Sequence, residues 1–313
     1  MFETIKVAII QASPIYYDLA ASFGKAVTLI QEAAHDGAKL IALGETWLPG
    51  YPAWLDVCPN AALWDHEPTK QVFARLHANS ITVPGKETEA LGRLARENDV
   101  VLIIGVNERV NTGPGNGSIY NTIITIDADG RLINHHRKLV PTYTERMVWG
   151  YGDSRGLKAV DSSIGRVGGL VCWEHWMPLS RQAMHNSNEH IHAALWPAVK
   201  EMHQVASRHY AFEGRCFVLA AGSMMTARDL PDELAKPTDL KKNPDEWVLR
   251  GGSAIIAPDG RYLAGPVYEE ESIITAELDL SEITKEKMTL DVTGHYSRPD
   301  VFEFGIRENR NFV

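Results

Sequence analysis

Residues 120–139 read YNTIITIDADGRLINHHRKL, two strand-like runs that flank an Asp-Gly turn. Apolar runs on either side of such a turn are a strong local signal for a β-hairpin. Residues 251–268 read GGSAIIAPDGRYLAGPVY and repeat the apolar run, the Asp-Gly-Arg turn and the returning run. This repeat predicts two similar halves within the chain, related by a pseudo-two-fold axis.

The segments that precede the two hairpins alternate between strand-like and helix-like patterns. Short, apolar, β-branched runs occur at 6–13, 39–45, 100–110, 166–171, 190–198 and 216–222. Apolar residues at helical spacing lie between them, near 20–35, from about 86 to 97, from near 177, and across about 203–214. This alternation predicts an α/β protein with buried strands, and two such halves packed sheet to sheet make a four-layer sandwich.

Composition and charge narrow the class of protein. The 313 residues are 44% hydrophobic and 23% charged, without a linker-like stretch, so we expect a single domain over 1–313 with a C-terminal tail from about 281. A formal net charge of −9 disfavours nucleic acid and anionic membranes as partners. The apolar runs are too short to span a bilayer and the start lacks a signal-peptide pattern, so we expect a cytoplasmic protein. The poorly periodic segment 55–80 predicts a surface or interface insertion.

The chain has three cysteines, Cys58, Cys172 and Cys216, without CxxC spacing, which argues against a disulfide framework or a zinc ribbon. Cys172 ends an apolar run and precedes a helix that opens at Pro178, so its thiol is expected at a tight strand-to-helix turn. There, helix N–H groups favour a thiolate, and the N–H of Trp173 can face negative charge on a substrate. Taken alone, each cysteine is better explained as an inert residue of the core.

Two further side chains become informative beside Cys172. Glu45 ends the apolar run KLIALGE, and burial there would raise its pKa toward that of a general base. Lys138 closes the second strand of the first hairpin. Each residue also has an interpretation without a catalytic role. Glu45 would then face solvent or cap a turn, and Lys138 would be a solvated side chain beside Arg137. Together, the three supply the base, the stabilising cation and the nucleophile of covalent acyl-type catalysis.

Three segments that hold these residues, LIALGETWLPGYP, HRKLVPTYTER and GGLVCWEHWMPL, resemble the signature segments of the nitrilase superfamily in order and approximate separation. The start KVAIIQASP, the stretch RHYAFEGRCFVLAAG and the end GHYSRPDVFEF also resemble the nitrilase branch itself. The Cys-Trp-Glu triplet at 172–174 and the segment GHYSRPDVF distinguish that branch from amidases and carbamoylases.

The resemblance implies an α-β-β-α sandwich that hydrolyses a small organic nitrile to the carboxylic acid and ammonia, with no cofactor or metal. It assigns Glu45 as base, Lys138 as cation and Cys172 as nucleophile. Glu145 matches a second family glutamate, although pairing with Arg146 is an alternative, and Glu174 matches the triplet with a structural role left open. The resemblance also implies a homodimer formed through helices, or a larger homo-oligomer, extended in some members to spirals or filaments.

Aromatic residues near the motifs suggest a ring-lined substrate pocket, and we expect Tyr51, Trp54 and Trp196 to contact the substrate, with core packing as the alternative. The pairs His135-His136 and His190/His192 would allow a metal site, but no clustered metal-ligand motif supports one. The glycines of NTGPGNGS (111–118) lack a phosphate-loop pattern and indicate a flexible turn. Two other functions stay open, an amidase or carbamoylase of the same superfamily and a catalytically silent scaffold.

Overall fold

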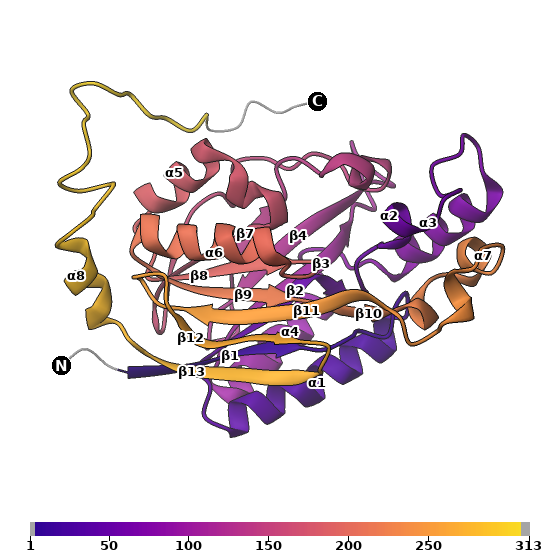
Figure 1. Cartoon of the computed structure of the whole chain (residues 1–313), viewed down its shortest axis with the longest axis horizontal. Coiled ribbons are helices and arrows are strands. Elements are labelled where there is room, and N and C mark those ends of the chain that lie inside the picture. Colours follow the sequence, from indigo (N-terminus) through magenta and orange to yellow (C-terminus); the bar gives the residue numbers. More distant parts are fainter. Residues whose placement is uncertain (1–3, 308–313) are drawn as a thin grey trace.

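The computed structural model describes residues 4–307, which form two β-sheets packed face to face between helices (Figure 1). Adjacent strands of the first sheet are β13 (Ser272–Asp279), β1 (Thr4–Gln11), β2 (Leu40–Leu48), β3 (Val101–Arg109), β4 (Ile119–Ile126) and β5 (Leu132–Arg137). The second sheet has the order β10 (Met224–Thr226), β11 (Trp247–Ile256), β9 (Phe217–Gly222), β8 (Ile191–Trp196), β7 (Gly165–Val171) and β6 (Val160–Ser162), and β12 (Tyr262–Tyr268) pairs with β11.

The two sheets repeat one pattern, which confirms the predicted internal duplication. In the first sheet β1, β2 and β3 are parallel and are followed by the antiparallel hairpin β4–β5. In the second sheet β7, β8 and β9 are parallel and are followed by β11–β12. Both hairpins turn at the predicted glycine, Gly130 with φ 88° and Gly260 with φ 83°. A side chain disfavours this left-handed backbone, which explains the glycine in both turns.

Helices cover the outer face of each sheet (Figure 1). Helices α1 (Leu19–His35) and α4 (Lys86–Asn98) lie on the first sheet, and α5 (Pro178–Asn186) and α6 (Glu201–Gly214) lie on the second. Their positions confirm the predicted helical segments. Helix α1 begins where Asp18 accepts a hydrogen bond from the Ala21 N–H at 2.9 Å, and it buries Ala26, Ile30 and Ala33 at helical spacing.

The segment predicted as an irregular insertion is partly helical. Residues 55–80 overlap α2 (Trp54–Val57) and contain α3 (Glu67–Asn79), which contacts α7 (Asp232–Ala235) at one end of the molecule (Figure 1). Helix α3 buries only Val72 and Leu76 among its hydrophobic residues, a stripe too narrow to give a clear helical period. The loop before α3 carries Trp64, whose side chain is 98% exposed. The prediction that segment 55–80 is a surface insertion therefore fits this loop.

Short 3₁₀ turns complete the described chain: η1 (Tyr143–Met147), η2 (Cys172–Trp176), η3 (Ala227–Asp229) and η4 (Leu240–Lys242). The last helix is α8 (Ser281–Lys287), and residues 288–307 form neither helix nor strand. Within residues 4–307, no helix combines the length and the apolar character that crossing a bilayer requires.

A bulge in β2 gives Glu45 its place. Leu43 pairs with Ile104 of β3, but the next pair joins Leu48 to Val106, so residues 44–47 lie opposite Gly105 alone. The strand therefore continues past Glu45, where the sequence predicted its end. A Cβ atom on Gly105 would lie 2.4 Å from the Gly44 carbonyl oxygen, so glycine is required for the bulge to approach β3.

We therefore expect Gly105→Ala to lower the free energy of unfolding by about 1–3 kcal/mol, because the added methyl group overpacks the bulge. The matched control is Gly24→Ala on α1, where a Cβ atom would meet nothing within 4 Å. That variant should gain roughly 0.5–1 kcal/mol, because alanine favours a helix interior. Urea denaturation measures both, and equal stability of the two variants would contradict the role given to Gly105.

Candidate active site

Four predicted residues from separate segments meet inside the molecule. Glu45 comes from the bulge of β2, Lys138 directly follows β5, Glu145 lies in η1, and Cys172 begins η2 after β7. The Lys138 Nζ atom lies 3.0 Å from Glu45 Oε1 and 2.7 Å from Glu145 Oε2, and all four side chains are buried. One side-chain ligand atom from each of Glu45, Glu145 and Cys172 lies within 4.8 Å of the others. The first sheet thus supplies Glu45 and Lys138, and the second supplies the thiol of Cys172.

Neighbouring donors hold both carboxylates in place. Asn121 Nδ2 donates to Glu45 Oε1 at 2.6 Å, while the Tyr51 hydroxyl donates to Glu145 Oε1 at 2.8 Å. The sequence reading missed Asn121, although a polar residue within a buried hairpin strand was an available signal. The alternative pairing for Glu145 is not seen, because the Arg146 Nε atom donates to the Pro141 carbonyl oxygen instead.

Burial and charge set the proton affinities of this cluster. Desolvation raises the pKa of Glu45 above its ordinary value, and the nearby Glu145 adds to this, whereas Lys138 and Asn121 oppose it. Desolvation would lower the pKa of Lys138, but the surrounding acidic groups outweigh it and keep the ammonium protonated. The Glu45 Oε2 atom is buried and has no hydrogen-bond partner. Glu45 can therefore accept a proton at this oxygen.

Cys172 occupies the expected strand-to-helix turn, with the left-handed φ of 51°. Burial raises the pKa of its thiol well above the ordinary value, while the Lys138 charge and the backbone N–H of Trp173 lower it. Attack by the sulfur therefore depends on a nearby base that removes the proton as the new bond forms.

Glu174 links the thiol turn to the segment that carries the lysine. Its carboxylate accepts hydrogen bonds at 2.8 Å from the Val171 N–H and from the Leu139 N–H, and lies 3.0 Å from Nε2 of His136. Burial would raise the pKa of Glu174, but His136 and these donors hold it below the ordinary value. The contacts give Glu174 a structural role, the reading that the sequence left open.

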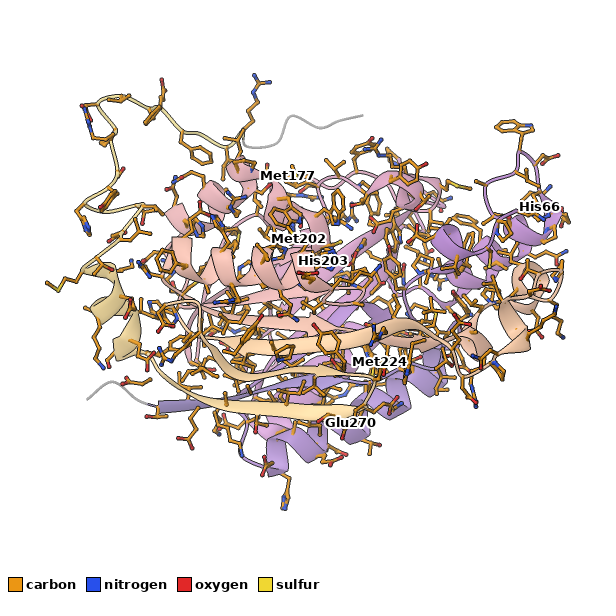
Figure 2. The ribbon with its side chains drawn as sticks, in the orientation of Figure 1. His66, Met177, Met202, His203, Met224 and Glu270 are labelled. Carbon is orange, nitrogen blue, oxygen red and sulfur yellow. The ribbon has the colours of Figure 1, made fainter. Side chains whose placement is uncertain are left out.

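A cavity of about 620 Å³ opens onto Cys172. Its lining includes Tyr51, Glu145, Trp173 and His203. His203 belongs to α6 and is labelled in Figure 2. Tyr51 thus lies where a substrate contact was expected. Trp54 and Trp196 are fully buried and are not among the lining residues.

Trp196 is packed between two histidines rather than against the cavity. Its ring stacks on His175 with the centroids 4.8 Å apart and on His203 with the centroids 4.4 Å apart. A substrate contact by Trp54 or Trp196 stays a prediction.

The histidine pairs considered for a metal are engaged elsewhere. His135 lies 2.8 Å from Glu108, His136 contacts Glu174, and His192 contacts Glu189. Within residues 4–307, the one group of acidic, His and Cys ligand atoms close enough to hold a metal ion is that of Glu45, Glu145 and Cys172. There the Lys138 ammonium already bridges the two carboxylates.

Known proteins share this sequence and fold. The family model "Carbon-nitrogen hydrolase" matches residues 6–287. A protein named Nitrilase 2, from an unknown prokaryotic organism, is 41% identical over 97% of this chain and 93% of its own length. An aliphatic nitrilase from Sinorhizobium fredii is 38% identical over 97% of this chain and 96% of its own, and a bifunctional nitrilase/nitrile hydratase from Lupinus angustifolius is 38% identical over 98% and 87%.

Solved structures repeat the fold at lower identity. A carbon-nitrogen hydrolase from Helicobacter pylori superposes with a TM-score of 0.71 at 18% identity, covering 96% of this chain and 97% of that chain. A Saccharomyces cerevisiae protein, a member of branch 10 of the nitrilase superfamily, gives 0.71 at 21% identity, covering 94% and 97%. The two structures confirm the four-layer sandwich expected from the duplicated sequence. With the family model spanning most of the chain and close relatives over nearly its full length, this protein belongs to the carbon-nitrogen hydrolase family.

Proposed function

We propose that this protein is a nitrilase that hydrolyses a small organic nitrile to the carboxylic acid and ammonia. The observation that carries this function is the meeting of the Cys172 thiol with Glu45, Lys138 and Glu145 in one buried cluster, of which Cys172 and Glu145 line the cavity. Covalent catalysis on a C–N bond needs a nucleophile, a base and a cation, and these groups supply all three. Relatives at 38–41% identity that are named nitrilases support the nitrile as substrate.

The first half of the reaction forms a thioimidate. The Cys172 sulfur attacks the nitrile carbon while Glu45 takes the thiol proton, so that a C–S bond forms as one C–N π bond breaks. The proton then passes to the nitrile nitrogen, which leaves a neutral thioimidate. The Lys138 ammonium and the Trp173 N–H stabilise the negative charge that develops on nitrogen. Glu145 holds Lys138 together with Glu45, through its Oε2 atom at 2.7 Å from Nζ.

The second half releases both products. Glu45 activates a water molecule that adds to the thioimidate carbon, and the tetrahedral species expels ammonia to give a thioester. A second water hydrolyses the thioester, which returns the thiol and releases the acid. If the tetrahedral species expels the sulfur instead, an amide leaves, so we expect some amide. The combined nitrilase and nitrile hydratase name of the lupin relative is consistent with this partition.

Amide hydrolysis is the nearest alternative, because the same three groups serve an amide carbonyl. The second alternative is a protein of this fold that has no catalytic activity. The buried cluster of Glu45, Lys138, Glu145 and Cys172 argues against it. Ammonia release measured in parallel on a nitrile panel and an amide panel, with the acid and amide products both quantified, separates these functions. Ammonia from the amides alone would replace the nitrilase assignment.

The site also supports the proposal that residues 1–313 act as one domain with a tail from about 281. Glu45 and Lys138 come from the first sheet and Cys172 from the second, so neither half holds the catalytic set by itself. Cys58, Cys172 and Cys216 are all free thiols, which fits the reducing environment of the cytoplasm that we propose for this enzyme.

We expect Cys172→Ala to abolish both nitrile turnover and the covalent adduct, because the attacking sulfur is lost. Intact-mass measurement after addition of nitrile detects the adduct. Cys58→Ala and Cys216→Ala are the controls, since neither thiol lines the cavity, and both should keep turnover. An adduct on the Cys172→Ala protein would remove Cys172 from the mechanism.

Glu45→Gln should keep the shape of the side chain and lower turnover by at least about a hundredfold, because it removes the base. Lys138→Ala should lose about as much, because it removes the stabilising cation. In the wild type, kcat/KM should fall with decreasing pH as Glu45 gains a proton. Since burial raises the pKa of Glu45, this fall should begin well above the roughly 4.3 of an exposed glutamate. Normal turnover of either variant, or full activity down to pH 5, would contradict these roles.

We further propose that the enzyme is a homodimer or larger homo-oligomer assembled through α5 and α6. Both helices pack against η2, the turn that carries Cys172. Large apolar side chains of η2, α5 and α6 are exposed: Trp173, Trp176, Leu179, Met202, Val205 and Phe212. Leu179 is 72% exposed and Met202, on α6 in Figure 2, is 57% exposed. A second copy would bury these groups and brace the turn.

Leu179→Glu should therefore shift the mass measured by light scattering toward the monomer and lower activity per subunit. Trp64→Glu is the matched control, because it places the same charge at an exposed apolar residue on the distant loop before α3. It should change neither mass nor activity. A fully active monomer would show that the interface does not support the site.

A further inference from the structure

A chain of buried side chains runs from the nucleophile into the layer between the second sheet and α6. Nδ1 of His175 lies 2.7 Å from the carbonyl oxygen of Cys172, and Nε2 of His175 lies 3.0 Å from Nε2 of His192. Nδ1 of His192 lies 2.9 Å from Glu189 Oε2, and the Tyr210 hydroxyl donates to the other oxygen of Glu189. All these side chains are buried, and His175, His192, Glu189 and Tyr210 do not line the cavity.

Donors and acceptors fix the direction of these hydrogen bonds. A carbonyl oxygen only accepts, so Nδ1 of His175 carries a proton and donates to Cys172. Desolvation and the charge of His192 lower the pKa of His175 well below its ordinary value, which keeps its ring neutral. Nε2 of His175 therefore accepts, and Nε2 of His192 donates to it.

Glu189 stands near the end of this hydrogen-bonded series that lies away from Cys172. Burial raises the pKa of Glu189, but His192 and the Tyr210 hydroxyl outweigh it, so Glu189 is a carboxylate. Nδ1 of His192 donates to that carboxylate, 2.9 Å from Glu189 Oε2. The hydrogen-bonded pair of His192 and Glu189 thus braces His175 from the side away from Cys172.

The hydrogen bond from His175 to the Cys172 carbonyl also fixes the orientation of the peptide between Cys172 and Trp173. A trans peptide is planar, so the C=O of Cys172 and the N–H of Trp173 point in opposite directions. A donor that fixes the carbonyl on the interior side consequently also fixes the direction of the Trp173 N–H, which lowers the pKa of the Cys172 thiol. The left-handed φ of 51° at Cys172 is unfavourable for a non-glycine residue and needs such outside support.

Other charged groups around His175 are occupied with different partners. Arg181 donates to the His175 carbonyl oxygen at 3.1 Å and to Glu213 at 2.7 Å. His185 also lies 3.1 Å from Glu213, and its ring packs on Tyr210. His203 faces His175 from beyond the ring of Trp196. Among residues 4–307, the side chain bonded to the Cys172 carbonyl is that of His175.

We propose that His175, braced by the His192–Glu189 pair, is a positioning residue of the reaction. It holds the peptide after Cys172 so that the Trp173 N–H supports the thiolate and then the negative nitrogen of the substrate. This role rests on the proposed nitrilase function for its effect on turnover. Its effect on the thiol itself exists without substrate and is measured separately.

Two amide variants of His175 distinguish the effect of its hydrogen bond to Cys172 from the effect of its side-chain volume. In His175→Asn the amide nitrogen takes about the place of Nδ1 and keeps the donor to Cys172. In His175→Gln the amide nitrogen lies one bond further out, near the place of Nε2, and that donor is lost. His185→Gln is the matched control, because it removes a buried histidine from the same cluster without touching Cys172.

The first readout is alkylation of Cys172 by iodoacetamide as a function of pH without nitrile, followed by peptide mass. The Trp173 N–H lowers the pKa of the thiol, so its loss in His175→Gln should move the midpoint to higher pH. The second readout is nitrile turnover, where kcat should fall by at least about tenfold with KM nearly unchanged. His175→Asn should stay close to the wild type in both, and His185→Gln should lose thermal stability only.

Equal behaviour of the Asn and Gln variants, or an equal loss of kcat in His185→Gln, would reduce His175 to a packing residue. If His175→Gln does not fold, His192→Leu removes the bracing donor and leaves His175 in place. It should shift the alkylation midpoint in the same direction by less, and an unchanged midpoint would overturn the proposal. A wild type that shows these alkylation shifts but hydrolyses no nitrile would refute the proposed function and leave the positioning role standing.

Discussion

The site depends on one buried cation shared by two carboxylates. Lys138 lies between Glu45 and Glu145, and all three side chains are removed from solvent. Removing one partner from such a buried set costs about 3–5 kcal/mol, because a charge is left without compensation. The fold must therefore place three distant segments together with little freedom. That requirement explains why Asn121 and Tyr51 each add a hydrogen bond to a carboxylate.

Glu174 joins the turn that carries the thiol to this charge cluster. By accepting the N–H groups of Val171 and Leu139, Glu174 locks the turn before Cys172 to the chain that follows Lys138. The Cys172 thiol and the Lys138 ammonium consequently keep a fixed separation although they come from different sheets. Two interior networks thus converge on Cys172, one through Glu174 on its N-terminal side and one through His175 on its C-terminal side.

Local signals in the sequence predicted much of this arrangement, and contacts between distant segments explain the rest. Asp-Gly turns and helical spacing act over a few residues, so both hairpins and the helices on both sheets were predicted correctly. Glu45 was found, but the bulge that aims it depends on how β2 pairs with β3 opposite Gly105. The hydrogen-bond partners of Glu174 include groups on other elements, so the sequence alone did not predict them either. The nearness of Trp196 to the motifs led to the prediction of a substrate contact, but its ring stacks on two histidines.

The duplicated hairpins offer an internal comparison between what the fold needs and what the chemistry needs. Both turns carry the same Asp-Gly-Arg sequence, and in both the aspartate accepts the arginine N–H, at 2.9 and 3.0 Å. The residue after the returning strand differs: it is the buried Lys138 in the first hairpin and Glu269, which pairs with Arg250 at the surface, in the second. The same hairpin unit thus occurs twice, and the Asp-Gly-Arg turn forms whether the strand after it leads to a buried lysine or to a surface glutamate.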